Sequence, residues 1–242
     1  MFSHNNRYAS PFVNEIVEER IVIVDYVKFR DNALLMAEDG YIPVFGEFNE
    51  PLAEIVGECI WKIKRSGKKE ATLLIDSGGG KNVAFNTMRS TMIESGLTFR
   101  GLVLGRACSN GFNILQACHT RESVSGAYFM YHWGTAWLGN NELDALINGE
   151  QWVIDFVIEM EMNTMRFISE RTGIPIKELK TIAKQERYYP AKFALKANMI
   201  DRIINHVPLA IIETMKEVRK EIPTAEEAPV SEKKKKDKKS KK

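Results

Sequence analysis

A serine between a strand-like and a helix-like segment is the first residue whose position suggests chemistry. The stretch GRACSNG (105–111) follows the apolar run 102–104 and places Ser109 where a strand ends and a helix begins. A hydroxyl there is held out from the sheet edge, beside the unpaired N–H groups and the positive dipole end of the helix. The same groups stabilise an oxyanion, as acyl transfer requires. Serine is equally typical of an ordinary helix N-cap, so Ser109 alone does not decide between the two.

Two other segments could complete a nucleophilic site. The glycines of SGGG (77–80) follow an apolar run, and their backbone can approach a ligand closely and direct N–H groups at it. They are not typical of a phosphate loop, because Lys81 is followed by Asn82 instead of Ser or Thr. His132 ends the run AYFMYH (127–132), where an imidazole is suited to take a proton from a serine, although a core histidine is the plain alternative. Spacing does not select the acid, because a triad is assembled in space.

The elements that must position these residues follow from the hydrophobic periodicity. Apolar residues recur at helical spacing over 50–67, 82–96 and 109–118, and apolar runs over 71–76, 98–105 and 127–132 are typical of buried strands. This alternation with short loops predicts an α/β fold with a largely parallel sheet. Ser109, His132 and the glycines are then expected at one sheet edge. Further along, the pattern predicts a long helix over 141–171, shorter helices over 175–185, 190–197 and 209–221, and a last strand over 199–207.

The two ends of the chain differ from this central part. Residues 20–29 and 32–46 are β-rich or apolar segments separated by turn-prone residues, and they predict a hairpin ahead of the main sheet. At the other end, 221–232 is rich in Pro, Ala and Glu, as linkers are. The chain has 34 basic and 32 acidic residues, and its last twelve residues hold eight Lys and two acids. Such a run is typical of a disordered, solvated tail.

Composition limits the class of protein. Three Cys without a C-x-x-C pair argue against a disulfide scaffold and a zinc site, and they are consistent with a reducing compartment. The N-terminus lacks the apolar run of a signal peptide, and no stretch comes near the roughly 18 apolar residues of a membrane helix. We therefore expect a cytoplasmic location, no membrane contact, no metal and no cofactor. The lysine run lacks interleaved aromatic and Arg residues, so nucleic acid is not an expected partner either.

Taken together, these residues resemble the proteolytic subunit of the Clp protease, over about residues 41–205. The family turn I-N-S-P-G-G is matched by residues 75–80, and the nucleophile motif G-x-A-A-S-M-G-A by 105–112, with no gap in the interval between them. The histidine motif R-V-M-I-H-Q-P is matched by 128–134. A later R-D-R-F-L-S-A run is similar to 185–191, and a final G-L-V/I-D to 198–201.

The resemblance implies a catalytic triad. Ser109 would be the nucleophile and His132 the general base, and Glu186 falls where the family has its catalytic aspartate. Glutamate is one methylene longer than aspartate, and triads with Glu exist on other folds. The geometry must shift to accommodate this reach, since an imidazole held in the wrong tautomer loses orders of magnitude in rate. A weakly active or inactive relative is therefore one alternative.

The resemblance also assigns roles to the backbone near the serine. The N–H groups of Gly80 and Asn110 would form the oxyanion hole, and Gly78 and Gly79 would border the bound substrate strand. The chain departs from the family here, since Gly78 replaces Pro and Asn110 replaces Met. The pair 133–134 is Trp-Gly where the family has Gln-Pro.

The implied architecture is a ClpP/crotonase-like α/β fold of repeated β-α units with a long, handle-type helix. We expect an N-terminal extension with the hairpin over 1–40, a Clp-type peptidase domain over 41–221, and a disordered linker and Lys-rich tail over 222–242. By resemblance, the chain would be a hydrolase, an ATP-dependent serine endopeptidase that cleaves unfolded polypeptide. It would act inside stacked rings of a homo-oligomer, with 141–171 in contact between rings and a separate AAA+ ATPase unfoldase feeding the chamber.

Three alternatives stay open on the sequence. The first is a non-catalytic, structural subunit of the same fold. The second is an acyl-CoA enzyme of the crotonase class, which also directs two backbone N–H groups at an oxyanion but needs acidic residues nearby, and the Ser–His pairing disfavours it. The third is a relative of the signal-peptide peptidases with a Ser–Lys dyad, in which a lysine would replace His132 as the base.

Overall fold

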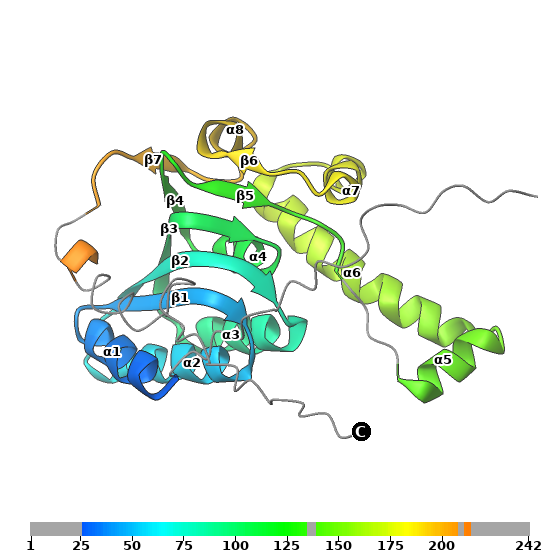
Figure 1. The fold of residues 1–242 in the computed structure, drawn as a ribbon, viewed down its shortest axis with the longest axis horizontal. Helices are drawn as coiled ribbons and strands as arrows, with labels where there is room; N and C mark the ends of the chain where they lie inside the picture. Colours follow the sequence, from blue (N-terminus) through cyan, green and yellow to red (C-terminus); the bar gives the residue numbers. More distant parts are fainter. Residues whose placement is uncertain (1–25, 135–138, 208–210, 214–242) are drawn as a thin grey trace, which may run out of the picture.

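The computed structural model describes residues 26–134, 139–207 and 211–213 of the chain (Figure 1). In chain order, its elements are α1 (Tyr26–Glu38), β1 (Tyr41–Phe48), α2 (Glu50–Arg65), β2 (Glu70–Gly80), α3 (Asn82–Ser95), β3 (Thr98–Cys108), α4 (Asn110–Gln116), β4 (Thr120–Val124), β5 (Tyr128–Met130), α5 (Asn140–Ile147), α6 (Gln151–Thr172), α7 (Ile176–Gln185), β6 (Tyr189–Pro190), α8 (Ala191–Lys196) and β7 (Arg202–Ile204).

The sheet confirms the predicted α/β fold. Its strands run in the order β1-β2-β3-β4-β7, and each neighbouring pair is parallel. The long strand β3 has two partners in turn, because residues 100–103 pair with β4 and residues 106–108 pair with β5. Strand β5 then pairs antiparallel with β6. Helices α1, α2 and α3 gather beside the β1 end of the sheet, whereas α6 runs far beyond it and carries α5 at its outer end (Figure 1).

Local sequence explains the regular part of this fold. Helix α2 buries one apolar stripe completely, and the side chain of Asn49 caps its start by accepting a hydrogen bond from Leu52 N at 3.0 Å. The central strands β2 and β3 are apolar on both faces, as strands covered by helices on both sides are. Gly101 of β3 lets α4 approach, since a Cβ there would lie 2.6 Å from Leu115 Cδ1.

The predicted N-terminal hairpin is wrong in its described part. Residues 26–38 form helix α1, which buries Phe29, Ala33, Met36 and Ala37 against the core. Their spacing is helical, and α1 packs on β1 and α2 instead of standing apart as an extension. Strand β1 starts only at Tyr41. The strand-like residues 20–25, the remainder of 1–25 and the predicted tail over 222–242 lie outside the described residues.

Three further elements differ from the prediction. Strand β2 continues through the glycines to Gly80, so Gly79 and Gly80 pair with the end of β1, after a register shift, and SGGG is not a turn after the strand. Strand β4 was not predicted. The expected helix over 141–171 is two helices, because Gly149 adopts a φ of 75° between α5 and α6. Of the predicted final helix over 209–221, residues 211–213 are helical and the rest is outside the described part.

Candidate active site

Ser109 occupies the junction that the sequence predicts, but it does not cap the helix. It lies between the end of β3 and the start of α4, and its side chain makes no capping hydrogen bond. Its backbone has a φ of 52° and a ψ of −123°, a conformation that residues with a side chain rarely adopt. Its N–H donates to Met130 O at 2.8 Å, which ties it to β5. The hydroxyl is therefore directed by a sharp strand-to-helix turn and not by capping.

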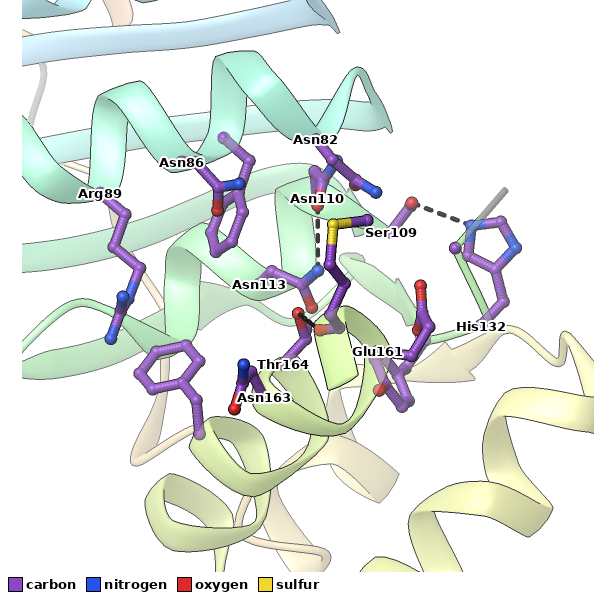
Figure 2. Close-up of a pocket in the computed structure, with 15 residues that line it drawn as sticks. Asn82, Asn86, Arg89, Ser109, Asn110, Asn113, His132, Glu161, Asn163 and Thr164 are labelled. Atoms are coloured by element: carbon purple, nitrogen blue, oxygen red, sulfur yellow. Dashed lines mark hydrogen bonds between the residues drawn. The ribbon is translucent and has the colours of Figure 1, made fainter. Parts of the chain in front are cut away.

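His132 faces this hydroxyl. It follows β5 by two residues, and its Nε2 lies 2.9 Å from Ser109 Oγ, the hydrogen bond drawn in Figure 2. The register of the sheet explains the meeting, because Cys108 and Met130 are partners at the ends of β3 and β5. The other described histidines lie elsewhere, since His119 accepts a hydrogen bond from Phe99 N and His206 is exposed. A serine and a base within hydrogen-bond reach can perform nucleophilic catalysis.

Glu186 approaches the other side of the imidazole, but loosely. Its Oε1 lies 3.4 Å from His132 Nδ1, and 66% of its side chain is exposed. It caps the C-terminus of α7 with a φ of 48°, so its carboxylate is presented from a helix end and not from the sheet. The distance is at the long limit of a hydrogen bond. The three residues predicted as a triad are thus brought together, with one short contact and one long contact.

The glycines of β2 pack against the serine, and two of them need to be glycine. Gly79 has a φ of 101°, and a Cβ there would lie 2.5 Å from Ser109 Cβ. Gly80 has a φ of 142°, and a Cβ there would meet the backbone of Phe48 at 2.5 Å. Gly78 and Gly80 line a cleft of about 750 Å³ together with Ser109 and His132. Gly79 packs against Ser109 and does not line this cleft.

Asn110 has a second role that the sequence did not reveal. Its buried side chain donates to Gly80 O at 2.7 Å and to Asn82 Oδ1 at 2.8 Å. Its Oδ1 accepts a hydrogen bond from Asn113 Nδ2 at 3.0 Å. The side chain therefore joins the carbonyl of Gly80 to the start of α4, and it holds together the two residues whose N–H groups are predicted to form the oxyanion hole. The signal for this was the recurrence of Asn at 82, 110 and 113.

A second hollow opens from the Ser–His pair between α3, α4 and α6 (Figure 2). This polar cavity has a volume of about 380 Å³. Its lining residues are Asn82, Phe85, Asn86, Arg89, Ser109, Asn110, Asn113, Tyr131, His132, Gly134, Met160, Glu161, Asn163, Thr164 and Phe167. Sequence reasoning missed the contribution of α6, because residues 160–167 lie far along the sequence from every motif that pointed to the site.

Nearby reactive groups do not compete with Ser109. Burial raises the pKa of the adjacent Cys108 thiol to about 11, so this sulfur stays protonated at neutral pH.

Among the described residues, His, Cys, Asp and Glu form no cluster that could hold a metal ion. In the same part of the chain, no helix is long and apolar enough to cross a membrane.

Comparison with known proteins identifies the family of the chain. The family model described as Clp protease matches residues 27–207. The chain is 27% identical over 140 residues to ATP-dependent Clp protease proteolytic subunit 2 of Nocardia farcinica, covering 57% of this chain and 66% of that protein, just under two thirds. The proteins of the same name from Thermobifida fusca and Chlamydia pneumoniae are 25% and 20% identical, over 64% and 70% of this chain and 74% and 82% of theirs. The chain belongs to the Clp protease family.

Proposed function

We propose that this chain is a serine endopeptidase of the Clp type, which hydrolyses peptide bonds of unfolded polypeptides. The observation that carries the proposal is the 2.9 Å approach of His132 Nε2 to Ser109 Oγ, at a serine whose side chain makes no capping hydrogen bond. A helix cap would direct the hydroxyl at its own helix, whereas this hydroxyl faces a base. The Ser–His pairing also disfavours the crotonase class and a lysine-based dyad.

The proposed reaction uses each group in a defined way. Ser109 Oγ attacks the scissile carbonyl carbon while His132 Nε2 takes its proton, and the carboxylate of Glu186 orients the imidazole from Nδ1. The N–H groups of Gly80 and Asn110 donate to the oxyanion. His132 returns the proton to the leaving amine, which leaves an acyl-enzyme on Ser109. A water then attacks the ester while His132 takes its proton, and His132 returns this proton to Ser109 Oγ as the carboxylic acid is released.

The proposed assembly is a homo-oligomer of stacked rings, located in the cytoplasm and fed by an AAA+ ATPase unfoldase. Membership of the Clp protease family supports it, as do relatives named ATP-dependent proteolytic subunits. Helices α5 and α6 expose large apolar side chains, which suits contact between copies of the chain. These residues include Ile147, Trp152, Phe156 and Ile158, each more than half exposed.

Labelling with a fluorophosphonate tests the proposal. We expect an adduct on Ser109 in the wild type and in His206→Ala, a control that changes an exposed histidine outside the site. The adduct should form far more slowly in His132→Ala and not at all in Ser109→Ala. Labelling that is absent, or that does not depend on His132, would favour a structural, non-catalytic subunit. Turnover of an enoyl-CoA by Ser109→Ala would favour the crotonase class.

A further inference from the structure

The polar cavity next to Ser109 has the position of a pocket that selects the substrate. Ser109 and His132 both line it, so a side chain near the reacting carbonyl can enter it directly. Its volume of about 380 Å³ is within the range of specific ligand pockets. What enters it depends on the groups that line it.

The lining is mixed, since Phe85, Met160 and Phe167 lie beside several amide and hydroxyl groups, and the polar groups favour a side chain that is polar at its end. Asparagines at 82, 86, 110, 113 and 163 line the cavity, together with Thr164. An apolar side chain would remove water from these amides and this hydroxyl without replacing their hydrogen bonds, which is unfavourable. A side chain with hydrogen-bond donors and acceptors would satisfy them instead.

Two buried atoms of the lining lack a partner among the described residues. Asn113 is 7% exposed and Tyr131 is 2% exposed, and neither Asn113 Oδ1 nor the Tyr131 hydroxyl oxygen has a hydrogen-bond partner. Both atoms are closed to solvent, so they make the wall of the cavity more polar but are not contact points for a ligand inside it.

Glu161 supplies a negative charge on the catalytic side of this cavity. It is half-buried, and it makes no ion pair or side-chain hydrogen bond among the residues that the structure describes. Its carboxylate lies against Gly134, where a Cβ would collide with Oε1. Burial and the Glu161 charge both raise the pKa of Tyr131, which keeps that hydroxyl protonated. A partly buried carboxylate without a cation is a natural counter-charge for a ligand.

The one positive side chain of the described lining is at the other side. Arg89 lies on α3, away from Ser109, and its guanidinium stacks 4.5 Å from the ring centre of Phe167 (Figure 2). Glu161 lies on α6, on the side of His132 (Figure 2). A cation that enters past Ser109 therefore meets Glu161 before Arg89, whereas an anion would have to pass Glu161.

We propose that this cavity binds a basic side chain, Lys or Arg, of the residue that contributes the scissile carbonyl, with Glu161 as its counter-charge. The inference rests on the proposed peptidase function. Substrate specificity is then set by Glu161 together with access to the chamber, and the enzyme cleaves after basic residues.

The test uses the full chain and peptidyl diphenyl phosphonates that differ only in this residue, which is Lys, Gln, Leu or Glu. These probes react covalently with a catalytic serine, so the adduct on Ser109 can be followed by mass spectrometry without turnover. We expect the Lys probe to react fastest. Glu161→Gln should lower the ratio of Lys to Leu rates by about ten-fold or more, the worth of one charge-assisted hydrogen bond. Glu159→Gln, on the same helix but paired with Arg166, should keep the ratio.

The possible failures are distinguishable. No adduct with any phosphonate or with a fluorophosphonate would overturn the proposed function itself. An adduct with the fluorophosphonate, but with Leu, Gln or Glu preferred over Lys, would overturn only the specificity. A Lys preference that survives in both Glu161→Gln and Glu161→Ala would likewise remove Glu161 from this role.

Discussion

We predict that Glu186→Gln slows peptide hydrolysis by only about ten-fold. Glu186 Oε1 lies 3.4 Å from His132 Nδ1, and 66% of the glutamate side chain is exposed. Two opposite charges at this separation in water attract by about 1.2 kcal/mol, and about 1.4 kcal/mol corresponds to a ten-fold change in rate. A buried, tightly bonded triad acid contributes about 10⁴-fold, because it also holds the imidazole in the correct tautomer. Because Glu186 is exposed to solvent, its replacement should lower the rate by much less than about 10⁴-fold.

The assay is kcat/KM for a fluorogenic peptide, measured for wild type, Glu186→Gln and His132→Ala. Glu178→Gln is the matched control, because Glu178 is an exposed acid on the same helix α7 and does not face the histidine. Glu186→Gln should remain far more active than His132→Ala. A loss of about 10³-fold or more would refute the reasoning, since it requires a desolvated pair. A rate equal to that of the control would remove Glu186 from the triad.

Three other substitutions test the backbone and hydrogen bonds of the site and one buried ion pair of the fold. Ser109→Gly should unfold at higher denaturant than Ser109→Ala, by about 1 kcal/mol, because relief of the positive φ exceeds the added flexibility of glycine; an equal or more stable Ala variant would contradict this. Asn110→Ala keeps the backbone N–H of residue 110 but removes the side-chain hydrogen bond to Gly80 O. We expect kcat to fall about five- to ten-fold with KM nearly unchanged. A change confined to KM would contradict the idea that this side chain positions the oxyanion hole. Asp201→Asn should destabilise by about 3 kcal/mol, since it leaves the buried Arg121 guanidinium unpaired. Burial opposes the ionisation of Asp201, but hydrogen bonds from Arg121 outweigh this effect and lower the pKa of Asp201. The stabilisation from the Arg121–Asp201 pair is therefore fully present above the ordinary pKa range of aspartate, and it is lost as the pH falls through the lowered pKa. Denaturant unfolding at pH 7 and pH 3 should show a flatter pH dependence in Asp201→Asn than in the wild type.

The pairing of Ser109 with His132 was predictable because it depends on few and regular rules. Parallel strands end at one edge of the sheet, and residues one or two positions beyond Cys108 and Met130 must then be neighbours. Both strands are recognisable by their apolar runs. A sequence that fixes strand ends in this way also fixes which polar side chains meet.

Strand β4 was not predictable by the same rules. It contains Arg121 and Glu122, which read as loop residues, yet both are buried. Arg121 pairs with Asp201, and Glu122 pairs with Arg100 and Arg202. A buried charge requires its partners, and these partners are distant in the sequence. The break at Gly149 was hidden for another reason, because the apolar period continues on both sides of it.

The two contacts of His132 differ in how firmly the fold holds them. The short contact to Ser109 is set by paired strands, whose hydrogen bonds hold both backbones in register. The long contact to Glu186 depends on the end of α7, a short helix whose C-capping residue, Glu186 itself, has a left-handed backbone and an exposed side chain. Sheet registers are rigid, whereas exposed helix ends are held by few contacts. We therefore expect substitutions along β3 and β5 to impair catalysis more than substitutions around Glu186, and we expect Glu186, where the resemblance implies an aspartate, to contribute little to the rate.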